Sequence, residues 1–207
     1  MPSNRMPLIE CLAALRQARR DDEVVITAMG TAREWMKLGS HPLDFVFVPS
    51  SMGQASSLGL GMALAKPEQN VIVCNGDGST LMNLGSLVTI TAEAPKNLTL
   101  LLFDNRVYEV TGSQITPGSS DSRSDNRDVD FGSLAKACGF QSVFEFNTLQ
   151  EWQDTVRDVI ESTGPTCAWV KVNPIPNAGG PRSPSPGRKR AVEFAEALRE
   201  CSSTSEA

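Results

Sequence analysis

The sequence has few of the residues that disulfide, metal-cluster and histidine chemistry require. Its five cysteines are an odd number and form no CxxC pair, which argues against a disulfide framework, a zinc knuckle and an iron–sulfur cluster. We therefore expect reduced thiols in a cytoplasmic protein. The single histidine, His41, precedes Pro42. No nucleophile elbow accompanies it, so we interpret it as a loop residue rather than a catalytic one.

Long apolar runs and basic patches are also missing. No stretch approaches the roughly 20 apolar residues that span a bilayer. The net charge of −5 comes without the basic face that nucleic-acid binding requires. We therefore expect neither a membrane nor a nucleic acid as a partner. What remains is a chain of 207 residues with 40% hydrophobic content, which suits one globular domain with a substantial core.

Short apolar runs alternate with helical patterns along the chain. Strands are predicted at residues 23–30, 44–50, 70–76, 97–105, 141–146 and 166–172. Helices are predicted at residues 7–20, 31–39, 53–65, 79–94, 129–139, 147–163 and 188–200. Such alternation is typical of βαβ units. The predicted fold class is therefore α/β, a doubly wound, mostly parallel six-stranded sheet with helices on both faces.

Two segments interrupt this alternation. Residues 108–128 are rich in Gly, Ser, Thr and Asp and have no periodicity, and residues 173–187 form a Pro/Gly-rich arm. A long loop inside a compact domain is commonly functional or mobile, so both segments are candidate lids over a substrate. We divide the chain into a main domain at 1–175 and an arm with a C-terminal helix at 176–207.

An acidic residue, Asp77, lies between two glycines directly after the third predicted strand, and Asn105 ends the fourth. In such sheets ligands bind beyond the carboxyl ends of the strands. The helix that begins after Asp77 favours an anion such as phosphate, which the carboxylate alone would repel. Mg²⁺ resolves this conflict, because it binds carboxylate and amide oxygens together with phosphate oxygens. The pattern therefore predicts a metal-bridged diphosphate.

Each half of this pattern is a weak signal by itself. A GDG turn and a DN turn are usually structural, and only their placement after successive strands, with a helix between them, favours a site. No P-loop of the form GxxxxGK[ST] competes with it. The partial GxGxxG at 59–64 falls within a predicted helix, where we interpret it as small-residue packing.

These residues resemble the thiamine diphosphate motif. Gly76-Asp77-Gly78 is followed after 25 residues by Asp104-Asn105. Residues 50–117 are similar to the diphosphate-binding half of the sulfopyruvate and phosphonopyruvate decarboxylases, and the likeness extends more weakly over residues 8–175. The resemblance implies a thiamine diphosphate-binding fold, with thiamine diphosphate and Mg²⁺ as cofactors.

The resemblance implies a role for each matching position. The Mg²⁺ ligands would be Asp77, the side chain of Asn105 and the carbonyl of Val107. The diphosphate would accept hydrogen bonds from Gly78, Ser79 and Thr80. Met52 would wedge the cofactor into its bent form. Further cofactor contacts would come from Gly30, Thr31, Ser50, Gly76 and Tyr108.

Three positions depart from the family pattern. Asp104 replaces the first Asn of the usual pair, at a position that is not the usual metal ligand. Cys74 replaces an aliphatic residue, which is a packing change. Glu109 stands where many relatives carry Gly, and it would either reach the site or lie in a solvated loop. Tyr108, beside it, is expected to pack rather than to react.

The chain has room for only one half of such an active site. Thiamine catalysis attacks a 2-oxo acid with a carbanion and uses the thiazolium ring as an electron sink for loss of CO₂. In the family, a glutamate from a separate pyrimidine-binding domain activates the cofactor. The resemblance therefore implies a β-type decarboxylase subunit without an identified catalytic residue, working with an α-type chain in an α2β2 or larger hetero-oligomer.

The sequence does not name the small 2-oxo acid substrate. Thr111, Gln114 and Arg182 are candidates for substrate contacts. Arg182 could pair with a sulfonate or phosphonate, although an exposed surface arginine is the commoner case. Two alternatives stay open, an acetolactate synthase-like carboligase subunit and a non-catalytic cofactor-binding partner. A ferredoxin-linked oxidoreductase subunit is disfavoured because the cluster-binding cysteines are absent.

Overall fold

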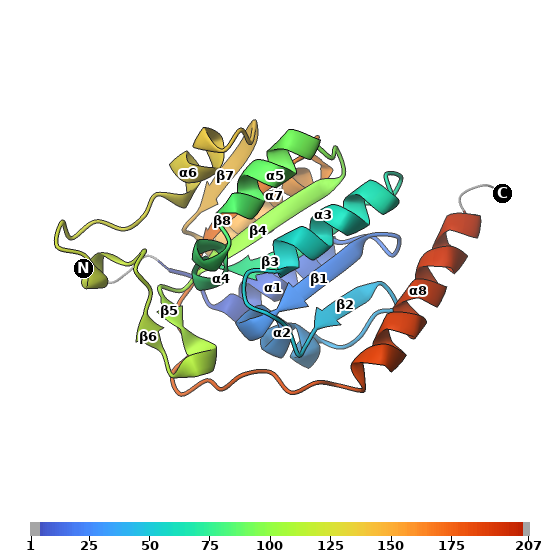
Figure 1. The fold of residues 1–207 in the computed structure, drawn as a ribbon, viewed down its shortest axis with the longest axis horizontal. Coiled ribbons are helices and arrows are strands. Elements are labelled where there is room, and N and C mark those ends of the chain that lie inside the picture. The colour runs from blue at the N-terminus through green and yellow to red at the C-terminus, as the bar shows by residue number, and fades with distance from the viewer. Residues whose placement is uncertain (1–4, 205–207) are drawn as a thin grey trace.

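The computed structural model describes residues 5–204 and confirms the predicted six-stranded parallel sheet. Its strand order is β2-β1-β3-β4-β8-β7 (Figure 1), and every pairing is parallel. The strands are β1 Val24–Ala28, β2 Asp44–Phe47, β3 Val71–Gly76, β4 Leu98–Asp104, β7 Ser142–Phe146 and β8 Thr166–Lys171. The central strands β3 and β4 are buried along almost their whole length, as their continuous apolar runs predict.

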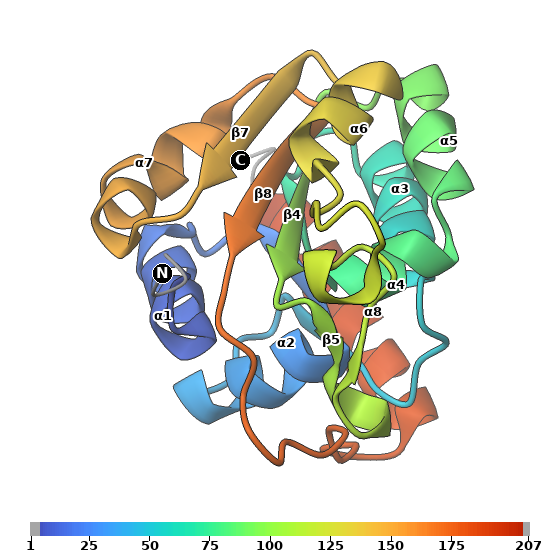
Figure 2. The ribbon, with the colours of Figure 1, turned by 90° about the vertical axis from the view of Figure 1, so that its left-hand side faces the viewer.

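Helices cover both faces of the sheet (Figures 1 and 2). One face packs against α1 Leu8–Ala18, α2 Met29–Trp35 and α7 Leu149–Glu161. The other packs against α3 Ala55–Ala65, α5 Gly85–Glu93 and α6 Phe131–Ala137. The helices that follow the neighbouring strands β1 and β3 thus lie on opposite faces. This arrangement is the switch point at which open α/β sheets form a ligand crevice.

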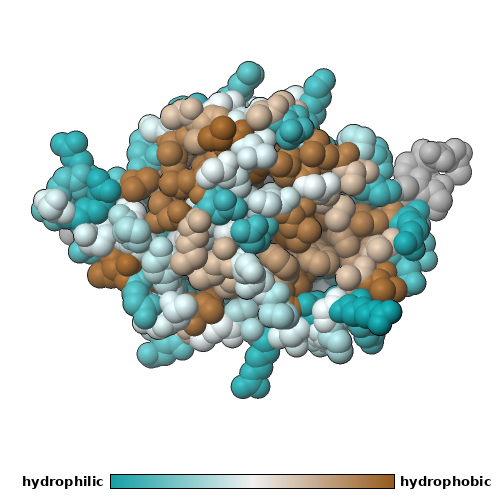
Figure 3. Space-filling view, in the orientation of Figure 1, coloured by the Kyte–Doolittle hydropathy of each residue, from teal (hydrophilic) through white to brown (hydrophobic). Residues whose placement is uncertain are grey.

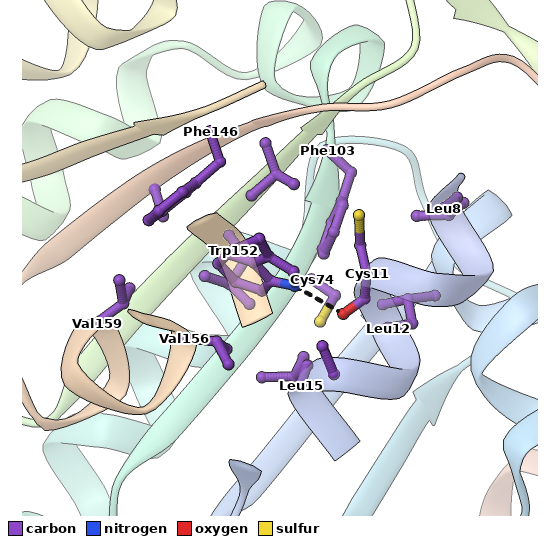
Figure 4. Close-up of a cluster of buried hydrophobic side chains, with 14 of the residues drawn as sticks. Leu8, Cys11, Leu12, Leu15, Cys74, Phe103, Phe146, Trp152, Val156 and Val159 are labelled. Atoms are coloured by element: carbon purple, nitrogen blue, oxygen red, sulfur yellow. Dashed lines mark hydrogen bonds between the residues drawn. The ribbon is translucent and has the colours of Figure 1, made fainter. Parts of the chain in front are cut away.

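The core on the first face is built around Trp152 of α7 (Figure 4). Its indole N–H donates to the Cys11 carbonyl of α1 at 2.9 Å, which joins the two helices across the core. Cys11 and Cys74 are fully buried there, and burial raises the pKa of the Cys11 thiol to about 12. No disulfide joins any two cysteines of the described residues. The buried thiols of Cys11 and Cys74 therefore act as small apolar groups.

The single helix predicted at 79–94 is wrong, because the structure has two helices there. The first is α4 Asp77–Met82, and α5 begins at Gly85. At the break, the Asn83 side-chain amide donates to the Gly53 carbonyl at 3.0 Å, and the Asn83 main-chain carbonyl accepts from the Ser86 hydroxyl. Asn and Gly are poor helix formers, and the contact of Asn83 with Gly53 joins the break to the 51–54 turn.

The aperiodic segment after β4 contains short regular elements. The strands β5 Val107–Tyr108 and β6 Gln114–Ile115 form a small antiparallel hairpin. The 3₁₀ helices η2 Glu109–Thr111 and η3 Ser120–Ser122 lie within the same segment, and η1 Met36–Leu38 extends α2. The hairpin lies beside α4 at the carboxyl edge of the sheet (Figure 2), so this segment forms a wall there.

The arm after β8 runs along the carboxyl edge of the sheet to α8 Gly187–Thr204 (Figure 1). Phe194 of α8 packs against Phe45 of β2, with ring centroids 5.0 Å apart. Phe194 and Leu198 belong to the same apolar cluster as β1 and β3. A division of the chain near residue 175 stays a prediction. None of the described helices has the length and apolarity needed to cross a bilayer.

Candidate functional site

A pocket lies at the switch point, beyond the carboxyl ends of β1, β3 and β4. Its apolar part includes Leu8, Phe103 and Val172. Eleven of the residues predicted for the site line it: Gly30, Thr31, Met52, Gly76, Asp77, Gly78, Ser79, Asn105, Val107, Tyr108 and Thr111. The structure therefore brings together both halves of the sequence pattern, which are separated along the chain by α4, α5 and β4.

Asp77, the first residue of α4, is a buried carboxylate with an exposed fraction of 2%. The Thr116 hydroxyl donates to its Oδ2 at 3.1 Å, and the nearby main-chain N–H groups of Gly78 and Asn105 favour its charged form. Burial, reinforced by the charge of Asp104, raises the pKa of Asp77 to about 7. Within residues 5–201 no basic side chain forms an ion pair with it. A carboxylate in this position is stably charged only beside a cation.

Gly78 allows the Tyr108 ring to lie close to the start of α4. A Cβ atom at this position would lie 2.4 Å from Cε1 of Tyr108, so only glycine leaves room for the aromatic ring. Tyr108 therefore packs against the helix start, in the manner expected of a packing residue. The neighbouring Asn105 turns its Oδ1 toward the main-chain N–H of Val107 at 3.0 Å, which fixes the amide at the end of β4.

The oxygen donors in this pocket suit Mg²⁺ together with a phosphate. The carboxylate of Asp77 and the amide oxygen of Asn105 are hard ligands, and an amide oxygen has a second lone pair beyond its contact with Val107. Among the described residues, no cluster of three His, Cys, Asp or Glu could hold a metal by itself. Mg²⁺ commonly keeps few protein ligands and completes its shell with phosphate oxygens and water, so the donor set fits this pair of groups.

Four predicted residues do not line the pocket: Ser50, Thr80, Gln114 and Arg182. The Thr80 hydroxyl is turned inward, where it donates to the Gly76 carbonyl at 2.9 Å. Gln114 is exposed and bonds to Thr111 at 2.9 Å. Arg182 is also exposed. Of the three substrate candidates, only Thr111 therefore reaches the pocket. His41 lies outside it, and its Nδ1 accepts from the Leu43 N–H at 3.1 Å.

The alternative that Glu109 lies in a solvated loop is wrong, because its side chain is buried. Its exposed fraction is 4%, and it lines the pocket. Arg33 of α2 donates to its Oε2 at 2.8 Å, and the Ile175 N–H donates to its Oε1 at 2.8 Å. The sequence gives no signal for this arrangement, because Arg33 and Ile175 are each more than sixty residues away.

Sequence reasoning also missed Thr116 and Arg5. Thr116 follows the β5–β6 hairpin, is fully buried and contacts Asp77. Arg5 donates to Oδ2 of Asp104 at 3.1 Å, and the Trp169 indole donates to the same oxygen at 3.1 Å. Asp104 is thus held by Arg5 and Trp169 and does not line the pocket. The carboxylate that stands here in place of the usual Asn is therefore paired with Arg5.

The chain is similar in sequence to known thiamine pyrophosphate enzymes. The family described as thiamine pyrophosphate enzyme, C-terminal TPP binding domain, matches residues 27–170. The sulfopyruvate decarboxylase subunit beta of Methanothermobacter thermautotrophicus is 41% identical over 155 residues, which are 74% of this chain and 76% of that one. The phosphonopyruvate decarboxylase of Streptomyces viridochromogenes is 38% identical over 160 residues, which are 77% of this chain but only 38% of that one.

A solved structure supports the same fold. It is described as a putative thiamin diphosphate-dependent enzyme from Mycobacterium smegmatis, and it superposes with a TM-score of 0.66 at 18% identity. The match covers 82% of this chain and 32% of that one. This chain thus corresponds to about a third of some relatives and to most of a beta subunit. The chain belongs to the thiamine pyrophosphate (thiamine diphosphate) enzymes, through their C-terminal cofactor-binding domain.

Proposed function

We propose that this chain is the β-type subunit of a thiamine diphosphate- and Mg²⁺-dependent 2-oxo acid decarboxylase, of the sulfopyruvate or phosphonopyruvate type. The observation that carries the proposal is Asp77, a buried carboxylate beside Asn105 and the start of α4, without a basic partner in residues 5–201. The names of the two sequence relatives support the substrate class.

In this proposal, Mg²⁺ is held by Asp77, the side chain of Asn105 and the carbonyl of Val107. The diphosphate accepts hydrogen bonds from Gly78, Ser79 and the main chain of Thr80, because the Thr80 hydroxyl is occupied. Further contacts come from Gly30, Thr31, Ser50, Met52, Gly76 and Tyr108.

When bound, thiamine diphosphate supplies the nucleophilic carbon and the electron sink for loss of CO₂. The residues of this chain bind and orient it. The Thr116 hydroxyl holds the Asp77 carboxylate in place, where it would bind Mg²⁺ together with Asn105. Leu8, Phe103 and Val172 provide an apolar part of the pocket, which would limit the access of water to the bound cofactor.

The activating carboxylate is proposed to come from an α-type partner subunit. Of the described residues that line the pocket, only Asp77 and Glu109 are acids. Both carboxylate oxygens of Glu109 are engaged, by Arg33 and by the Ile175 N–H. The relative named subunit beta, and the longer relative of which this chain spans only 38%, support a second chain.

A hydrophobic face on α3, α4 and α5 is the proposed docking surface for this partner. Figure 3 shows hydrophobic residues gathered over these helices, and four large apolar side chains are exposed there: Leu64, Met82, Leu84 and Val88. A Cβ added at Gly61 or Gly85 meets no other atom within 4 Å, so a partner backbone can approach closely. The face is continuous with the pocket, because the turn at 51–54 that carries Met52 packs on Asn83.

The split site is tested by an activity assay with and without the α-type chain. Purified alone with Mg²⁺ and thiamine diphosphate, this chain is expected to release little or no CO₂ from sulfopyruvate, phosphonopyruvate or pyruvate. Addition of the α-type subunit from the same genome is expected to restore release. Strong activity of the isolated chain would refute the split site. A condensation product formed with the CO₂ would indicate a carboligase, and absence of cofactor binding in the complex would indicate a non-catalytic partner.

Replacement of Val88 by Asp is expected to weaken association with the α-type subunit at least tenfold, because a charge at the centre of an apolar contact must be desolvated. The matched control is Val192→Asp on α8, since Val88 and Val192 have similar exposed fractions of 56% and 50%. Co-purification and sedimentation measure the association. Equal retention of the partner by both variants would contradict the assigned face.

A further inference from the structure

We propose that Glu109 is a positioning residue that, through Arg33 and the main chain of Ile175, clamps the arm at 173–186 to the pocket wall. The arm then acts as a fixed strap along the carboxyl edge of the sheet rather than as a mobile lid. The inference rests on the proposed function in one respect, because the wall that the clamp holds includes the Val107 carbonyl assigned to the metal.

The clamp joins three separate parts of the chain at one carboxylate. Glu109 begins η2, directly after the pocket residues Val107 and Tyr108. Its Oε1 accepts from the Ile175 N–H of the arm, and its Oε2 accepts from Arg33 of α2, both at 2.8 Å. Arg33 also donates to the Gly179 carbonyl of the arm at 2.8 Å and to Glu34 at 2.8 Å. One ion pair thus holds the arm at two main-chain positions.

Close approach at Gly30 makes this geometry possible. A Cβ atom at Gly30 would lie 3.1 Å from Oε2 of Glu109, so the glycine lets the carboxylate reach the first turn of α2. Gly30 and Glu109 both line the pocket. A groove separates η2 from the arm over residues 174–179. Along this groove the arm is held by the hydrogen bonds of Ile175 and Gly179, and the Ile175 side chain packs against the core.

The C-terminal part of the arm is held at Val48, directly after β2. The Ser183 hydroxyl donates to the Val48 carbonyl at 3.2 Å, and Arg190 of α8 donates to the same carbonyl. Val48 precedes the loop that carries Ser50 and Met52. The arm therefore connects the wall after β4 with the loop after β2, on either side of the pocket. Figure 2 shows it passing below α2 and β5.

Loss of the Glu109 contacts is expected to free the arm and to loosen the wall together. In Glu109→Ala, trypsin cleavage after Arg182, which is exposed in the arm, should become about tenfold faster. The Kd for thiamine diphosphate with Mg²⁺ in the complex with the α-type subunit should rise about 10- to 100-fold, as is usual when a residue that orients a metal ligand is removed. Glu109→Gln keeps an acceptor for the Ile175 N–H and should give smaller changes of both quantities.

The matched control is Glu23→Ala, which removes another buried glutamate of an ion pair. Glu23 is 2% exposed and binds Arg157 at 2.6 Å, beside β1 at its amino end. This variant should lower the Tm without a change in cleavage or cofactor affinity. If Glu109→Ala behaved in the same way, the clamp would be refuted. Faster cleavage with unchanged affinity would refute its role in positioning the wall.

Two further outcomes are distinguishable. If the wild-type complex did not bind thiamine diphosphate with Mg²⁺, the proposed function would fail, and the cleavage rates would still decide whether Glu109 holds the arm. If Glu109→Ala did not fold, Glu109→Gln would carry the test, because it retains the size of the side chain and one of its two contacts. Unchanged cleavage after Arg182 in that variant would count against the clamp.

Discussion

Replacement of Asp77 by Asn is expected to abolish Mg²⁺-dependent binding of thiamine diphosphate and to leave the cofactor-free protein at least as stable as the wild type. The carboxylate is 2% exposed and has no basic partner in the described chain, so without a metal its charge is a cost to folding. Calorimetry of unfolding, with and without Mg²⁺ and the cofactor, measures both effects. The wild type should gain stability from the ligands, and Asp77→Asn should gain none.

The same residue gives the cofactor-free protein a specific dependence on pH. Burial, followed by the charge of Asp104, raises the pKa of Asp77 from 3.8 to about 7 in the folded state. Protonation therefore favours folding. This stabilisation is fully present below about pH 4 and is lost as the pH rises through about 7. The free energy of unfolding, measured relative to Asp77→Asn, should fall over that range by on the order of 4 kcal/mol, since each pKa unit is worth about 1.4 kcal/mol.

The control for both experiments is Asp154→Asn, on the exposed side of α7. It should change neither the ligand-dependent stabilisation nor the pH dependence. A wild-type protein with the same pH profile as Asp77→Asn would show that the carboxylate is not held in a desolvated position. Retention of cofactor affinity by Asp77→Asn would remove it from the metal site.

Replacement of Arg5 by Met is expected to lower the free energy of unfolding by about 3–5 kcal/mol, the usual effect of leaving one charge of a buried pair without its partner. The side chains of Arg5 and Asp104 are only 7% and 4% exposed. In Arg5→Met/Asp104→Asn, the stranded charge is gone and one acceptor oxygen remains at position 104, so part of the loss should be recovered. Urea unfolding of the wild type and three variants gives the coupling energy.

The exposed pair of Lys189 and Glu193 supplies a comparison, with side chains 63% and 58% exposed. Lys189→Met should change the free energy of unfolding by less than about 1 kcal/mol, because solvent screens such pairs. A similarly small effect of Arg5→Met would mean that Asp104 is satisfied without Arg5. An additive double variant would mean that the two side chains do not act as a pair.

Much of the site could be predicted because it depends on the local pattern and on the geometry of parallel sheets. The apolar runs that end at Gly76 and Asp104 are long enough to be buried strands, and parallel strands place their carboxyl ends at one edge. Asp77 and Asn105 therefore had to lie near each other once both strands were recognised. Glu109, Thr116 and Arg5 could not be found in this way, since each contacts a residue at least 39 positions away in the chain.

The sequence by itself determined the α/β class, the six strands and the pairing of Asp77 with Asn105 in one pocket. Those features follow from periodicity and from short motifs, which local chain geometry dictates. Only the tertiary structure decided that Thr116 contacts Asp77, that Arg5 neutralises Asp104, and that Glu109 is buried against Arg33. Hydrogen bonds and ion pairs of this kind depend on which loops meet in the folded chain. The sequence around a residue without periodicity does not indicate which distant residue it contacts.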